Sequence, residues 1–235
     1  VICFTDHYDK DYMGWGNDSI FDPEEYFKVL VPLQEKYKTQ IDVRIGVELG
    51  MQPHLGECFT ALTKSYPFDF VIGSVHAVQG TDPAMGMLFD GRTDEEAYRA
   101  AFEETLEDIK KIEDFDVLGH LDYVVRYGKE REKHYSYMKY ADILDEILKM
   151  LVEHGKGLEL NTAGLKYGLP FAHPHPDILR RYRELGGEII TVGADGHKPE
   201  HIAYDFQKVN DILRECGFTY YTEFRKRKPV FKQLS

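Results

Sequence analysis

The stretch FVIGSVH, residues 70–76, is an apolar, partly β-branched run that ends directly on a histidine. A run of this length and composition is typical of a strand buried in a parallel sheet. The same arrangement recurs along the chain: short runs that end on a residue type able to bind a metal. These runs are VICFTDH (1–7), VRIGVE (43–48), VLGH (117–120) and IITVGADGH (189–197). The recurrence predicts that several metal-ligand side chains meet at one edge of a sheet.

Helical patterns occupy most of the gaps between these runs. Asp22 and Thr93 supply N-cap oxygens, and Gly155 can end a helix in the left-handed conformation. The expected helices cover residues 24–37, 94–113, 140–154, 177–187 and 199–216, and further strands are expected at 157–161 and 218–221. Alternating strands and helices predict parallel pairing through right-handed crossovers. We therefore expect an α/β fold, with a TIM-like barrel as the economical architecture and an open doubly wound sheet as the alternative.

The position of the polar residues favours the barrel over the open sheet. Single ligand-type residues follow at least five different strands, and they can converge only if those strands form a ring. A flat sheet would hold the same side chains too far apart. The prediction is therefore a metal centre on a barrel rim.

Composition bounds the class of protein. A chain of 235 residues can bury roughly 70–75% of its unfolded surface in one core, so one domain covering residues 1–235 is expected. No apolar run approaches the roughly 18 residues that a membrane span requires. The net charge of −12 disfavours nucleic acid as a partner but leaves room for a small anionic substrate. Cys3, Cys58 and Cys216 suggest neither a disulfide framework nor a thiolate zinc site, which favours the cytosol.

The candidate ligands form a set suited to hydrolysis. Imidazoles and carboxylates leave a bound cation acidic enough to activate water. A carboxylate such as Glu48 can also bridge two cations about 3.5–4 Å apart. The candidate metal ligands are His7, Glu48, His76, His120, Asp195 and His197.

Each of these residues has a simpler interpretation when taken alone. Glu48 could be a solvated acid at a strand end, and His76 or His120 a hydrogen-bonded rim residue. Asp195 and His197 could belong to an ordinary Asp-Gly turn. The repetition of the same placement on successive strands favours the metal site.

Several of these motifs resemble one known family. FTDH (4–7), GVELG (46–50), IGSVH (72–76) and GADGH (193–197) resemble the PHP (polymerase and histidinol phosphatase) superfamily. LGHLDYVVRYG (118–128) and LELNTAGLKYG (158–168) are similar to its histidinol-phosphate phosphatase branch. The resemblance implies a distorted (β/α)7 barrel with two to three divalent ions, of zinc, iron or manganese. It also implies phosphomonoester hydrolysis by a metal-bridging hydroxide.

The resemblance also implies roles for individual residues. Glu48 would bridge two metals, His76 and His120 would complete one of them, and Asp195 would bind the other. The third metal would be held by His7 and His197, with Asp6 behind the ligands.

Substrate contacts are implied by the same resemblance. Arg126 would bind phosphate, although by itself it could be a surface charge. Lys166 occupies the position at which relatives often have a phosphate-binding arginine, so it would bind phosphate as well. Taken alone, it could instead be a solvated lysine. His173 could touch the substrate or simply precede the next helix. Asp122 is the candidate general acid, so Glu48, Asp195 and Asp122 are the predicted catalytic residues.

The chain departs from the family pattern at its start. The His-x-His strand of relatives, and a further histidine after it, are not found. Residues 1–7 correspond to the second strand of the family, so the expectation is that residues precede Val1 in the natural protein. The chain as given would then lack one barrel strand and up to three ligands.

The expected function is hydrolysis of L-histidinol phosphate to L-histidinol and phosphate, in histidine biosynthesis. Two alternatives remain: a PHP phosphoesterase acting on nucleotides or phosphoproteins, and a degenerate module without activity. A small phosphorylated substrate is the expected partner, with neither nucleic acid nor membrane. The sequence favours no particular oligomeric state.

Overall fold

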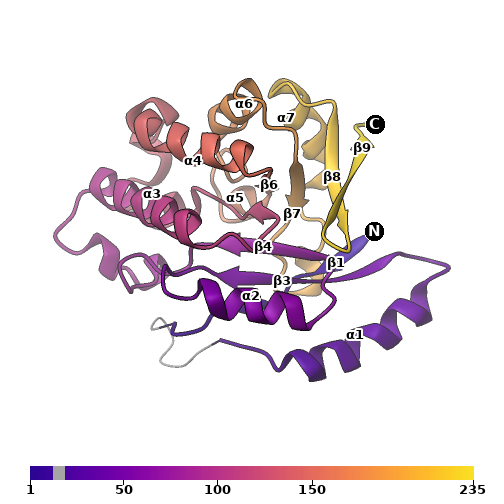
Figure 1. The fold of residues 1–235 in the computed structure, drawn as a ribbon. Helices are drawn as coiled ribbons and strands as arrows, with labels where there is room; N and C mark the ends of the chain where they lie inside the picture. Colours follow the sequence, from indigo (N-terminus) through magenta and orange to yellow (C-terminus); the bar gives the residue numbers. More distant parts are fainter. Residues whose placement is uncertain (13–18) are drawn as a thin grey trace.

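The computed structural model describes residues 1–12 and 19–235, and its central feature is a curled parallel sheet (Figure 1). The strand order is β1-β3-β4-β5-β6-β7, with β2 beside β3, and every pairing in this sheet is parallel. The strands are β1 (Ile2–Phe4), β2 (His7–Tyr8), β3 (Val43–Gly50), β4 (Phe70–Ser74), β5 (Val117–Leu118), β6 (Gly157–Asn161) and β7 (Ile190–Gly193).

This strand order decides between the two predicted architectures. A doubly wound sheet reverses its order partway across, whereas here the order follows the chain from β1 to β7. Helices lie around the outside of the curled sheet (Figure 1). The predicted barrel-type α/β fold is therefore confirmed, in the form of a half-barrel.

The helices follow the predicted ranges with three exceptions. Their bounds are α1 (Pro23–Tyr37), α2 (Gly56–Ser65), α3 (Asp94–Lys111), α4 (Ala141–Glu153), α5 (Ala163–Lys166), α6 (Pro176–Glu184) and α7 (Val209–Glu215). Asp22 caps α1, and Thr93 forms a capping box with Glu96 on α3. Helices α2 and α5 were not predicted; they follow Leu55 and Thr162, and neither residue makes a side-chain cap hydrogen bond. The predicted helix 199–216 was wrong over its first half, where two single 3-10 turns precede α7.

The sheet register brings the candidate ligands to one edge. His7 pairs with Glu48, and Glu48 pairs with Ile72 on β4. Strand β3 is buried along its whole length, with Val47 and Leu49 fully enclosed. A strand packed on both faces has little freedom to shift, so the polar residues at its carboxyl end are held at a fixed height.

The C-terminal part of the chain corrects another prediction. Residues 218–221 were expected to add a strand to the parallel sheet, but β8 (Tyr220–Arg225) instead forms an antiparallel hairpin with β9 (Lys228–Gln233). The basic run RKRK (225–228) spans the turn of this hairpin, in which Lys226 and Arg227 have positive φ. The hairpin packs against the amino ends of the parallel strands, where Phe224 stacks on Phe70 at 5.0 Å between ring centroids.

Arg227 links the hairpin to the parallel sheet through two ion pairs, and its loss is expected to destabilise the fold. Its guanidinium lies 2.7 Å from Asp116 and 3.0 Å from Asp114. Burial raises the pKa of Asp116, and Arg227 partly offsets that effect. We expect Arg227→Ala to lower the free energy of unfolding by roughly 2–4 kcal/mol, because it leaves a buried carboxylate without its cation. Denaturant unfolding measures this, and exposed Arg225→Ala is the control; equal stability of the two variants would contradict the role.

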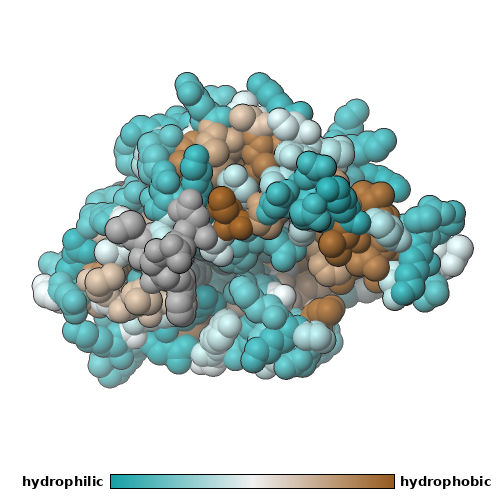
Figure 2. All heavy atoms as spheres, turned by 90° about the horizontal axis from the view of Figure 1, so that it is seen from below, coloured by the Kyte–Doolittle hydropathy of each residue, from teal (hydrophilic) through white to brown (hydrophobic). Residues whose placement is uncertain are grey.

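Three further observations concern the helices, the surface and the cysteines. None of the helices within 1–12 and 19–235 combines the length and the apolar character needed to cross a bilayer. The face in Figure 2 is largely hydrophilic with separate apolar patches, and exposed apolar side chains include Val29 and Val31 of α1. All three cysteines are free thiols.

Candidate metal centre

Three of the predicted ligands meet around the carboxylate of a fourth, Glu48, at the carboxyl edge of the sheet. Glu48 Oε1 lies 2.9 Å from His120 Nε2 and 3.1 Å from His76 Nε2. Its other oxygen, Oε2, lies 3.6 Å from His7 Nε2. The rings of His7 and His76 are stacked, with 4.8 Å between centroids. The four side chains come from residues 7, 48, 76 and 120, so the predicted convergence is observed.

Asp195 and His197 join the same cluster from the turn after β7. Asp195 Oδ1 lies 3.3 Å from His197 Nδ1, and the rings of His7 and His197 are 5.3 Å apart. The backbone of Asp195 is left-handed, with φ 48°, a conformation that aspartate tolerates better than most residues. This turn returns both side chains to the cavity, as the Asp-Gly-His motif predicts.

Three overlapping groups could each hold a cation, with all ligand atoms of a group within 4.8 Å of one another. They are Glu48 with His76 and His120, His7 with Asp195 and His197, and His7 with Asp9 and His76. All six predicted ligands belong to at least one group. Imidazole nitrogens and carboxylate oxygens are ligands that zinc, iron and manganese accept.

Asp9 is a member that the sequence interpretation missed. Its carboxylate is hydrogen-bonded to His7 Nδ1 at 3.1 Å and to His76 Nδ1 at 2.8 Å, so it orients both rings. A Cβ on Gly50 would lie 2.0 Å from Asp9 Oδ1, so only glycine leaves room for this carboxylate. The spacing His7-x-Asp9 mirrors Asp195-x-His197 and could have indicated it. Asp6, expected behind the ligands, is exposed and contacts neither ring in the described structure.

The electrostatics of the cluster show a site that attracts positive charge. Burial opposes protonation of His7 and His76, but Glu48 and Asp9 outweigh it and raise the pKa of both imidazoles. Burial opposes ionisation of Asp9 and Glu48, but the facing imidazoles hold the pKa of both carboxyls below the ordinary value. Divalent cations between these nitrogens and oxygens would supply the positive charge that the carboxylates favour. The residues present therefore fit the metal cluster that the family resemblance implies.

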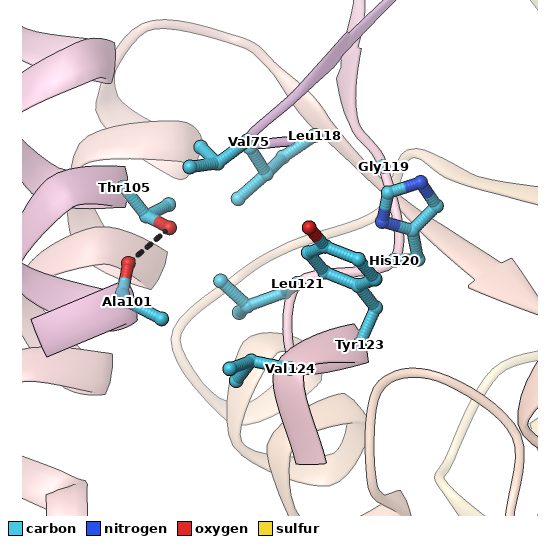
Figure 3. A pocket seen from close by; sticks show the side chains of 9 residues that line it. All are labelled: Val75, Ala101, Thr105, Leu118, Gly119, His120, Leu121, Tyr123 and Val124. Carbon is cyan, nitrogen blue, oxygen red and sulfur yellow. Dashed lines mark hydrogen bonds between the residues drawn. The ribbon is translucent and has the colours of Figure 1, made fainter. Parts of the chain in front are cut away.

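His120 is fixed from behind by apolar packing and by a second carboxylate. Figure 3 shows His120 and Tyr123 beside Val75, Leu118 and other apolar side chains, around a small cavity of about 10 Å³. The backbone N–H of His120 donates to Glu159 Oε2 at 3.1 Å. Burial raises the pKa of Glu159. Glu159 was not among the predicted site residues, because nothing in LELN marks it as different from a strand acid.

The cluster opens into a cavity of about 680 Å³, a volume suited to a small molecule. Its wall includes the aromatic residues Tyr12, Phe21, Tyr123, Tyr127 and Tyr167 and the charged residues Asp6, Asp9, Asp82, Arg126 and Asp195. The guanidinium of Arg126 lies 4.6–5.3 Å from three tyrosine ring centroids and 3.6 Å from Asp195 Oδ2. Arg126 is thus held in the cavity wall rather than exposed as a surface charge.

Three other predicted residues are not brought to this cavity. Asp122 and His173 are fully buried and bonded to each other, with 2.7 Å between Oδ1 and Nδ1. Asp122 also accepts from the hydroxyl of Tyr135 at 3.0 Å. Lys166 donates to the backbone oxygens of Ala194 and Asp195 at 3.0 and 2.7 Å. In this structure these side chains support the loops around the site, and none of the three lines the cavity.

Comparison with known proteins agrees with this geometry. The family model of the PHP domain matches residues 1–163, and the chain belongs to the PHP family. It is 33% identical to the histidinol-phosphatase of Lactococcus lactis, over 92% of this chain and 80% of the relative. It is 31% identical to a probable histidinol-phosphatase of Clostridium acetobutylicum, over 98% and 84%.

A solved structure extends the similarity to three dimensions. The crystal structure of histidinol phosphate phosphatase from Lactococcus lactis, complexed with zinc, L-histidinol and phosphate, aligns with a TM-score of 0.84. The alignment covers 97% of this chain and 86% of that chain, at 31% identity. The putative histidinol phosphatase of Listeria monocytogenes has the same fold, with a TM-score of 0.73.

Proposed function

We propose that this protein is a metal-dependent phosphatase that hydrolyses L-histidinol phosphate to L-histidinol and phosphate, within a single domain spanning residues 1–235. One observation carries the proposal: six candidate ligand side chains from five strand ends lie together, and five of them line one cavity that also holds a positioned arginine. The curated relatives with the same fold and similar sequence are histidinol-phosphatases. The substrate is accordingly a small phosphorylated molecule.

The metal ligands are proposed to be His7, Glu48, His76, His120, Asp195 and His197. Two to three divalent ions, with zinc as the first choice because the Lactococcus lactis structure contains it, would polarise the phosphoryl group. Asp9 fixes the ring orientations of His7 and His76 through their Nδ1 atoms, leaving each Nε2 to face the cavity side of the cluster.

The chain's own residues would orient the substrate. Arg126 is the group suited to bind phosphate, because its planar guanidinium matches two phosphate oxygens and three tyrosine rings restrict its position. The ion pair with Asp195 also links this arginine to the ligand turn. Holding the phosphate in one orientation lowers the entropic part of the barrier to attack by water.

The test is turnover by the purified, metal-loaded protein. We expect hydrolysis of L-histidinol phosphate with a kcat/KM at least tenfold above that for nucleoside monophosphates and a phosphoserine peptide. Metal analysis without chelators should find two to three ions of zinc, iron or manganese per chain. Faster turnover of a nucleotide or phosphopeptide would favour another specificity, and absence of bound metal and of all activity would indicate a degenerate module.

Two further expectations accompany the function. The protein is proposed to act in the cytosol, in keeping with its free cysteines. Nucleic acid is not proposed as a partner, since the net charge of −12 repels phosphate backbones over most of the surface.

A further inference from the structure

Asp82 is a buried carboxylate in the cavity wall that takes no part in the metal centre. It follows the turn after His76, where Val78 and Thr81 form an isolated bridge that sends the chain back toward the cavity. Its side chain caps the 3-10 helix η1 (Pro83–Met85), with Oδ1 accepting from the N–H of Ala84 at 2.7 Å. The residue is 5% exposed and lines the same cavity as the ligand cluster.

The charge of Asp82 is not compensated by a cation. Its oxygens accept from the N–H of Ala84 and the hydroxyl of Tyr12, and within residues 1–12 and 19–235 no basic side chain forms an ion pair with it. Residues 13–18, MGWGND, include no basic residue. A buried charge without a counter-ion is costly. A carboxylate has capacity for about four hydrogen bonds, so a further donor can be accommodated.

The neutral groups that line the cavity with Asp82 include three tyrosines, and Arg126 lies over the rings of two of them, Tyr123 and Tyr127. The third tyrosine is Tyr12. Burial is the largest cause that raises the pKa of Tyr12, and the hydrogen bond to Asp82 is the next. Burial is also the largest cause that raises the pKa of Tyr123, followed by the Coulomb interaction with Asp82. These phenols therefore stay protonated at neutral pH. Tyrosine faces next to a carboxylate form an environment that stabilises an organic ammonium group.

We propose that Asp82 binds the primary ammonium group of the substrate and so selects aminoalkyl phosphates over phosphomonoesters that lack an amine. This inference rests on the proposed function, since L-histidinol phosphate carries one ammonium group and one phosphate. The phosphate end faces the ligand cluster and Arg126, and the ammonium end faces Asp82 and Tyr12. Other cavity carboxylates are less suited: Asp9 is bonded to two imidazoles, and Asp6 is exposed.

The test compares two substrates in one variant. We expect Asp82→Asn to lower kcat/KM for L-histidinol phosphate by about 10- to 100-fold more than for its desamino analogue, 3-(imidazol-4-yl)propyl phosphate, because a charge-assisted hydrogen bond is lost for one substrate only. Asparagine retains a cap oxygen for Ala84, and partial misfolding would lower both rates by the same factor. Asp82→Ser, which also retains a cap oxygen, should give the same ratio if the asparagine variant does not fold.

The controls separate this inference from the proposed function. Asp211→Asn, at an exposed position on α7, should leave the ratio of the two kcat/KM values unchanged. An equal loss for both substrates, or no loss for either, would overturn the role of Asp82. A selective loss in Asp6→Asn rather than in Asp82→Asn would assign the ammonium to Asp6. Failure of the unmodified, metal-loaded protein to hydrolyse L-histidinol phosphate would instead end the proposed function.

Discussion

Replacing Glu48 with glutamine is expected to lower kcat/KM for L-histidinol phosphate by on the order of 10²–10³-fold or more. Glu48 faces three imidazoles with its two oxygens, at 2.9, 3.1 and 3.6 Å. Glutamine has nearly the same shape but no charge, and its amide nitrogen cannot serve as the second ligand oxygen. The variant should therefore retain its fold and lose both bound metal and turnover, measured by elemental analysis and steady-state kinetics on the same preparation.

A surface carboxylate provides the matched control for this variant. Glu103 is exposed on α3, so Glu103→Gln makes the same chemical change away from the cluster. It should keep the metal content and kcat/KM of the unmodified protein. If Glu48→Gln also kept the metal content and kcat/KM of the unmodified protein, Glu48 could not be a ligand. The proposed centre would then lose the carboxylate that three of the other candidate ligands face.

The second large effect concerns stability rather than catalysis, and it involves Asp108 in the interior of α3. The residue is fully buried, and in the described structure neither carboxyl oxygen has a hydrogen-bond partner. Burial, with a smaller contribution from Glu104, raises its pKa from 3.8 to about 8. At neutral pH the folded protein therefore keeps a proton that the unfolded chain has released.

This difference makes the folded state less stable as the pH rises. Between about pH 4 and pH 8 the native state binds more protons than the unfolded state, so each pH unit removes about 1.4 kcal/mol from the free energy of unfolding. From pH 5 to pH 8 the unmodified protein should lose roughly 4 kcal/mol more than Asp108→Asn, which has no proton to lose. Denaturant titrations at the two pH values measure the difference.

Contributions common to both proteins, including those of the histidines, cancel in this comparison. Asp211→Asn, at its exposed site on α7, should follow the unmodified protein at both pH values. Equal pH dependence of Asp108→Asn and the unmodified protein would show that water or a local rearrangement stabilises the buried carboxylate in its charged form.

The fold and the convergence of the six candidate ligands could be predicted from the sequence because both depend on local patterns. A buried strand has to be apolar, and a residue at its carboxyl end has to face the rim, so Glu48, His76 and His120 are marked by position alone. Comparable local chemistry marked the caps Asp22 and Thr93. The hairpin β8–β9 was missed because its last strand, KPVFKQ, is exposed throughout and carries no burial pattern.

The supporting residues could not be predicted, because their roles depend on contacts across the fold. Asp9 is identified by its distance to His76, which is 67 residues away in the sequence. Asp82 gains its significance from burial beside Tyr12, a partner 70 residues away. By contrast, His173 and Asp122 were predicted to serve the site from loops, but the structure shows both side chains fully buried.

The three candidate ligand groups share residues, and this affects how the metal-free protein would bind its ions. His7 belongs to two groups, and His76 also belongs to two. Asp9 is hydrogen-bonded to both rings through Nδ1, so an ion that orders one ring through Nε2 also helps to order the other, and the entropy of ordering them is lost only once. Occupancy should accordingly rise in a concerted way, with partly filled molecules scarce at every stage of reconstitution.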